Sequence, residues 1–205
     1  MKKINKYIQE RLHINKDTGN HSYNYHPKTI DELKELVDKL IKERGNDADL
    51  NDIDTSEITD MNYMFYKSNF NGDISNWDTS KVEDMYRMFL DSKFNGDISK
   101  WNVSNVKRMD SMFLRSEFTS KNGDISKWDV SNVKDMSYMF AYSEFNGDIS
   151  EWNVSNVKDM NSMFCKSKFT CENGDISKWD VSKVEDMYYM FTGTPLEKNP
   201  PKWYK

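Results

Sequence analysis

The chain reads Phe94-Asn95-Gly96-Asp97-Ile98-Ser99-Lys100-Trp101-Asn102-Val103-Ser104-Asn105-Val106 and continues through Met109 to Met112-Phe113. This unit recurs along most of its 205 residues. Met-Phe dipeptides stand at 64–65, 88–89, 112–113, 139–140, 163–164 and 190–191, so the interval is 24 or 27 residues. Self-similarity at such a period is the signature of units that stack on one another. The sequence therefore predicts six tandem repeats.

Two of the repeats are three residues longer than the others. The extra residues are Thr119-Ser120-Lys121 after Phe118 and Thr170-Cys171-Glu172 after Phe169. An insertion that always falls at one point of a repeat maps to a loop on one side of a stacked array. We therefore expect both insertions to lie on the same side of the stack.

Local signals within each repeat predict a strand and a helix. The glycine of Asn-Gly-Asp favours a turn, and Asp-Ile-Ser-x-Trp then resembles a short extended segment. Ser80 with Glu83, and Ser182 with Glu185, have the spacing of a helix capping box. The residues Val82, Met85, Met88 and Phe89 follow at helical spacing. The expected fold class is an α/β repeat solenoid with one short strand and one short helix in each turn.

Three regions are expected: an N-terminal helical cap over 1–47, the six-repeat solenoid over 48–194 and a C-terminal cap over 195–205. Thr29-Ile30-Asp31-Glu32 predicts a helix start, and Gly45-Asn46 predicts its end after Arg44. A shorter helix is expected over 3–12. At the other end, Pro200 and Pro201 remove backbone donors and so oppose further strand addition.

Composition limits the classes of function. The formal net charge is −5, which gives no broad basic field for nucleic acid. No stretch approaches the length of an apolar membrane span, and the start lacks an apolar signal region, so we expect a cytoplasmic location unless a leader is missing. Cys165 and Cys171 lie in one repeat only, which argues against a repeated disulfide or metal framework. Cys165 is expected to be a small buried thiol.

The pattern Phe-Asn-Gly-Asp-Ile-Ser-x-Trp-Asp/Asn-Val-Ser-x-Val-x-Asp-Met-x-x-Met-Phe closely resembles the repeat of about 25 residues in bacterial surface proteins. It is the repeat of Mycoplasma lipoproteins, grouped with BspA-like leucine-rich repeats, and the resemblance covers about residues 50–194. It implies a right-handed solenoid similar to leucine-rich repeats, with roles in adhesion or protein binding. It implies no enzymatic activity.

Stacking would turn each constant repeat position into a column of like residues. The aspartates are expected to accept N–H groups of their own turns rather than bind divalent ions, and the asparagines to bridge successive turns. The tryptophans are expected to pack in the core rather than form a sugar- or peptide-binding platform. These columns are Asp73, Asp97, Asp124, Asp148, Asp175; Asn71, Asn95, Asn122, Asn146, Asn173; and Trp77, Trp101, Trp128, Trp152, Trp179.

Catalytic, cofactor and metal sites are not expected. His13, His21 and His26 match no metal-binding spacing, and no Ser-His-Asp order, phosphate loop or His-Glu-x-x-His motif is present. We therefore expect no enzyme and no cofactor.

Positions that vary between repeats are better candidates for a binding surface, because they can change without disturbing the core. Tyr and Arg, which are enriched at interface hot spots, recur directly before the Met-Phe pairs, and Lys recurs directly before the tryptophans. The candidate partner-binding residues are Tyr63, Tyr86, Arg87, Tyr138, Tyr188, Tyr189, Lys100, Lys127 and Lys178. A solvated surface without a partner is the plain alternative for both series.

The leading expectation is a non-catalytic protein-interaction module in the cytoplasm. One form of it is an inhibitor carried by a phage or mobile element and acting on a host defence nuclease, as anti-CRISPR proteins do. A surface adhesin or structural repeat protein without its export signal is the second class. Nucleic-acid binding through the Lys and Tyr positions is the third, and it would show strongly salt-dependent affinity.

Overall fold

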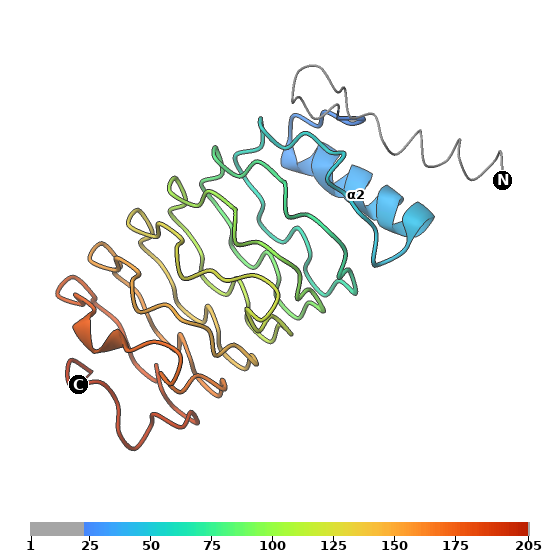
Figure 1. Ribbon diagram of the computed structural model, residues 1–205. Helices are drawn as coiled ribbons and strands as arrows, with labels where there is room; N and C mark the ends of the chain where they lie inside the picture. The colour runs from blue at the N-terminus through green and yellow to red at the C-terminus, as the bar shows by residue number, and fades with distance from the viewer. Residues whose placement is uncertain (1–22, 205) are drawn as a thin grey trace.

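The computed structural model describes residues 23–204, and they form a row of stacked coils (Figure 1). The colour gradient runs along the row, so each coil lies against its neighbours in the sequence. Helix α2 lies at the N-terminal end and the C-terminus lies at the other. No helix in the part of the chain described is long and apolar enough to cross a membrane.

Helix α2 spans Ile30–Arg44, as predicted. The Thr29 side chain accepts the N–H of Glu32, and Gly45 ends the helix at a φ of 93°. Leu33, Val37 and Leu40 are buried, so the helix covers the first coil with its apolar face. The shorter helix expected over 3–12 lies outside the described residues.

Successive coils are joined by a row of backbone hydrogen bonds that all point the same way. The N–H groups of Met61, Tyr63, Phe65 and Lys67 donate to carbonyls one coil further on, at 2.8–2.9 Å. The same four positions repeat the pattern through the coil of Met160, whose N–H donates to Asp186 at 2.8 Å. Along this row, N–H groups point toward the C-terminal end of the stack and carbonyls point toward the N-terminal end.

The expected α/β solenoid is wrong. Within residues 23–204 the regular elements are α2 and a single 3-10 turn, η1, at Ile176–Lys178. Neighbouring coils are paired only by isolated parallel bridges, such as Asp60 with Asp84, so no extended sheet forms. The expected leucine-rich-repeat-like coil of strand plus helix is therefore replaced by a coil of turns.

The prediction of two capping boxes is also wrong, because the serine and glutamate residues of both boxes form hydrogen bonds with other partners. The Glu83 N–H donates to the carbonyl of Thr59 in the preceding coil at 2.8 Å, and its carboxylate pairs with Lys107 at 2.6 Å. The Ser80 N–H is held by the Asp78 carboxylate at 2.9 Å. In the later repeat, Glu185 bonds to Lys158 in the same two ways.

Tight turns replace the predicted strand and helix. The N–H of Trp77 donates to the carbonyl of Ile74, and that of Met88 donates to Met85, three residues back in each case. One residue between such turns takes a left-handed conformation, which a helix cannot contain. These residues include Tyr63, Lys67, Arg87 and Asp91, with φ of 53–55°.

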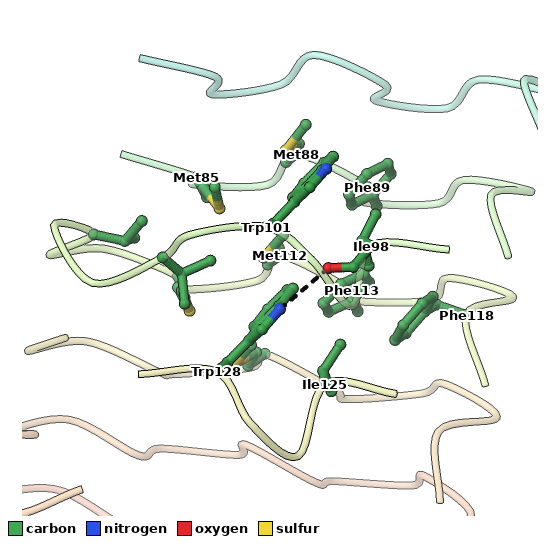
Figure 2. Close-up of a cluster of buried hydrophobic side chains, with 14 of the residues drawn as sticks. Met85, Met88, Phe89, Ile98, Trp101, Met112, Phe113, Phe118, Ile125 and Trp128 are labelled. Carbon is green, nitrogen blue, oxygen red and sulfur yellow. Dashed lines mark hydrogen bonds between the residues drawn. The ribbon is translucent and has the colours of Figure 1, made fainter. Parts of the chain in front are cut away.

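The core consists of columns in which each coil places the same side chain over the last. Phe89, Phe113 and Phe140 stack nearly parallel, with ring centroids 5.5 and 5.6 Å apart. Figure 2 shows two of these rings beside the methionines Met85, Met88 and Met112. No unit of this kind could offset the entropy of ordering its own residues, so the coils stabilise one another.

The tryptophans belong to this core, as expected. Trp128 is 4 % exposed, and its indole N–H donates to the carbonyl of Ile98 one coil back at 3.2 Å (Figure 2). The same bond joins Trp77 to Leu50, so a coil that includes Leu50 lies before the first Asn-Gly-Asp segment. Beyond Pro201, Trp203 continues the column, and its indole N–H donates to the Ile176 carbonyl at 2.9 Å.

The polar columns have the structural roles that the sequence predicts. Asp97 accepts the N–H of Ser99 at 2.9 Å, and the other four aspartates of its column each accept the N–H two residues further on. Asn71 accepts the N–H of Asn95, and the amide of Asn122 donates to the Asn95 carbonyl. No group of metal-ligating side chains is found in the described part of the chain.

Candidate functional site

The surface beside the Met-Phe pairs is positioned by the turns themselves. Met112 and Phe113 are fully buried, whereas the flanking positions differ in exposure from coil to coil: Tyr138 and Tyr142 are exposed, but Ser111 and Ala141 are buried. Left-handed residues before and after the pair separate the inward side chains from the outward ones. Because every coil repeats this geometry, the flanking residues that are exposed lie along one strip of the stack.

Tyrosine dominates this strip. Every exposed large hydrophobic residue in the described chain is a tyrosine that flanks a Met-Phe pair: Tyr66, Tyr138, Tyr142, Tyr188 and Tyr189. Their exposed fractions range from 41 % for Tyr66 to 72 % for Tyr188. We call the strip the tyrosine face and define it by these five residues together with Tyr63, Tyr86, Arg87, Arg108 and Arg115.

The first part of the tyrosine face is a packed group of rings and guanidinium groups. Tyr63 meets Tyr86 edge to face, with centroids 5.2 Å apart. Arg87 donates to the Tyr63 hydroxyl at 2.9 Å, and its guanidinium carbon lies 4.6 Å from the Tyr86 ring centroid. The guanidinium carbon of Arg108 lies 4.4 Å from the same centroid. Rings held in this way lose little conformational freedom on binding a partner.

The hydroxyls of this group differ in acidity. A hydrogen bond with the Tyr86 hydroxyl and the nearby Arg87 lower the pKa of Tyr63, whereas burial raises that of Tyr86. The Tyr63 hydroxyl accepts a hydrogen bond from Arg87 at 2.9 Å, and its ring packs edge to face against that of Tyr86.

A second group lies further along the strip. The Tyr142 ring is approached by Arg115 from the preceding coil at 5.4 Å and by Lys166 from the following coil at 5.3 Å. Tyr138 is 42 % exposed on the same coil as Tyr142. On the last coil, Tyr188 and Tyr189 lie with ring centroids 6.5 Å apart. With a spacing of about 4.8 Å between coils, the strip extends for about 24 Å from Tyr63 to Tyr189.

The sequence therefore identified part of this surface. Tyr63, Tyr86 and Arg87 come together, and Tyr138, Tyr188 and Tyr189 lie on the same strip. Lys100, Lys127 and Lys178 are exposed, but each stands in the turn before a tryptophan, and no contact joins them to the tyrosines within residues 23–204.

Sequence reasoning missed the residues after each Met-Phe pair. Tyr66, Tyr142, Arg115 and Lys166 vary from coil to coil as much as those before the pair do. The prediction considered only the two residues before each pair. Their variability was the signal that could have identified them.

A column of acidic residues lies at the start of the same segment. The residues bridged between coils are Asp60, Asp84, Arg108, Asp135, Asp159 and Asp186. Arg108 interrupts the acidic series and pairs with Asp84 at 3.0 Å and Asp110 at 3.2 Å. Burial, together with the charges of Asp135 and Asp186, raises the pKa of Asp159; burial and Asp135 raise that of Asp110.

The remaining candidates for chemistry are explained by local contacts. His26 Nδ1 lies 3.0 Å from Asp54 Oδ2 in an exposed pair, whereas His13 and His21 lie outside the described residues. Burial raises the pKa of both thiols, so Cys165 and Cys171 are held in the protonated form. Cys165 is only partly buried, which differs from the expected buried thiol.

These features define a tandem-repeat protein that presents a tyrosine-rich strip on a stack of turns. The chain belongs to the family described as Mycoplasma protein of unknown function, DUF285, whose model matches residues 32–122 and again 116–203. No curated protein and no solved structure matches the chain. The two family matches together cover all but the first two residues of α2 and all the coils.

Proposed function

We propose that the protein is a binding module that holds another protein against its tyrosine face. The observation that carries the proposal is the position of the exposed large hydrophobic residues: in residues 23–204 all are tyrosines beside Met-Phe pairs. Tyrosine supplies apolar area and a hydrogen-bonding hydroxyl at low cost in side-chain entropy. Arg87, Arg108 and Arg115 add the other residue type common at hot spots.

The form of the surface supports a protein partner over nucleic acid. The arginines of the strip are already paired with aspartates or packed against rings, as in Arg108 with Asp84 and Asp110. A column of aspartates runs beside them, and the chain carries a net charge of −5. Phosphate groups would be repelled there, because neutralising them requires free Lys or Arg.

A set of substitutions tests the tyrosine face with little risk to the fold, since other coils supply the replacements. We would make Tyr66→Thr, Tyr138→Ser and Tyr142→Asp together, because Thr192, Ser111 and Asp91 occupy these positions in other coils. The matched control replaces Lys100, Lys127 and Lys178 with Asn, the residue at position 76. Surface changes of this kind alter stability by about 0.5 kcal/mol or less each.

The assay is affinity capture from cells of the source organism, followed by mass spectrometry and titration with the purified captured protein. We expect the wild type and the lysine variant to capture the same protein with similar affinity. The tyrosine variant should lose at least tenfold in affinity with an unchanged melting temperature. Equal capture by all three would overturn the proposal, and capture abolished by nuclease treatment would indicate nucleic acid instead. Action on a defence nuclease stays a prediction, which the identity of the partner would test.

A further inference from the structure

The last coil leaves part of its backbone row without partners. In the coil before it, the N–H groups of Met160 and Ser162 donate to the carbonyls of Asp186 and Tyr188, both at 2.8 Å. The equivalent N–H groups of Met187 and Tyr189 have no acceptor among residues 23–204. Gly193, further along the same row, donates to the Glu197 carboxylate at 3.1 Å. The last coil thus presents backbone donors that require an acceptor.

Apolar side chains of the last coil are incompletely buried in the same region. Val154, Val157 and Met160 are at most 1 % exposed, because the next coil covers them. Their equivalents Val181, Val184 and Met187 are only partly buried. A polar outer face is what closes a terminal repeat, yet these positions keep the residues of an interior coil.

The C-terminal segment covers only the other half of this coil. Trp203 stacks on Trp179 at 6.2 Å, and Tyr204 meets Phe191 edge to face at 5.1 Å. The uncovered half forms a hollow lined by Val181, Glu185, Met187, Tyr188 and Trp203. It is a half-coil surface with both apolar groups and free backbone donors.

Asp186 is the last member of the acidic column, and its charge determines which kind of side chain is favourable next to it. Inside the stack, Arg108 lies over Asp84 of the preceding coil and pairs with it at 3.0 Å. By contrast, the charges of Asp135 and Asp186 act on Asp159 between them and help to raise its pKa. A basic side chain is therefore the favourable neighbour for Asp186.

We propose that this open half-coil binds a segment of another polypeptide with the pattern Val-Ser-x-Val-x-Arg/Lys-Met-x-x-Met. Its backbone carbonyls accept the N–H groups of Met187 and Tyr189, its valines and methionine cover Val181, Val184 and Met187, and its basic residue pairs with Asp186. Along this row, a second copy docked through the same end would place donors against donors. The N-terminal end of a copy is covered by the buried face of α2.

The chain itself supplies the probe: a synthetic peptide of residues 102–115, which contains Val103, Val106, Arg108 and Met109. The peptide would be titrated to several millimolar into the 15N-labelled full chain. We expect shifts of the Met187 and Tyr189 amide resonances and slower hydrogen exchange at both. Because the free peptide is ordered only on binding, a dissociation constant on the order of 1 mM is expected.

Two matched reagents make the test decisive. A peptide with Arg108→Asp should bind about tenfold more weakly, because it places a carboxylate over Asp186. The Tyr66→Thr, Tyr138→Ser, Tyr142→Asp variant should bind the peptide as the wild type does, which separates this surface from the part of the tyrosine face that carries these three residues. The proposal is overturned if the Met187 and Tyr189 amides do not shift, if the shifts map to Tyr66, Tyr138 and Tyr142 instead, or if both peptides bind equally.

Discussion

Replacing Trp128 with Phe tests whether inter-coil bonds hold the stack together. The change removes the indole N–H that donates to the Ile98 carbonyl at 3.2 Å and leaves a gap beside a side chain that is 4 % exposed. A hydrogen bond of this kind contributes about 0.5–1.5 kcal/mol. The lost apolar atoms, worth about 0.8 kcal/mol per methylene-sized group, bring the expected cost to about 2–3 kcal/mol.

Trp203→Phe is the matched control, because Trp203 makes the same bond, at 2.9 Å to Ile176, but is only partly buried. Water can replace the bond there and no enclosed gap forms, so we expect a cost below about 1 kcal/mol. Urea unfolding followed by tyrosine and tryptophan fluorescence measures both. With a slope of about 2–3 kcal/mol per molar urea, the Trp128→Phe midpoint should fall by about 1 M. Equal costs for the two variants would refute the reasoning.

Two further substitutions test the acidic column and the left-handed turns. Asp159→Asn keeps a side-chain oxygen that can accept the Asn161 N–H, which lies 2.8 Å from the carboxylate in the wild type. The change removes the charge repulsion that helps raise the Asp159 pKa. The free energy of unfolding at pH 7 should therefore rise by about 0.5 kcal/mol. Because the Asp159 pKa is raised in the folded state, the stability gained by the substitution should shrink as the pH falls through this folded-state pKa, and it should vanish below the pKa of the unfolded chain. Urea titrations in acid that still show the gain would contradict this. At Lys67, where φ is 53°, we expect the Gly variant to be about 0.5–1 kcal/mol more stable than the Ala variant. This is the reverse of the usual order in regular structure. Thermal unfolding of the two variants would decide, and a more stable Ala variant would show that the strain is absent.

The period and the core could be predicted from the sequence, but the local conformation could not. Val82, Met85 and Met88 are buried as the periodic pattern requires. An apolar residue at every third position is common to a helix and to a run of tight turns, so spacing alone does not distinguish them. What decides is the left-handed conformation of residues such as Arg87, and Arg carries no sequence signal for it.

The capping boxes failed for a related reason. Ser80 and Glu83 have the spacing of a helix start, but Asp78 lies two residues before Ser80 and takes its N–H. Glu83 then bonds to Thr59 and Lys107, which are 24 residues away on either side. Such partners exist only once the coils are stacked, so a local motif could not reveal them. Tyr66 and Tyr142 were missed from the candidate surface because the prediction considered only the two residues before each Met-Phe pair.

The shared direction of the N–H groups has a consequence for biosynthesis. A ribosome delivers α2 before the coils, and the apolar face of this helix can cover the first coil as soon as that coil emerges. Each completed coil then displays waiting amide donors to the tunnel exit, and the next length of nascent chain carries the oxygens that satisfy them. Along this row, coils can therefore be added one at a time in the order of translation, and a chain released early would keep unpaired backbone donors on its last coil.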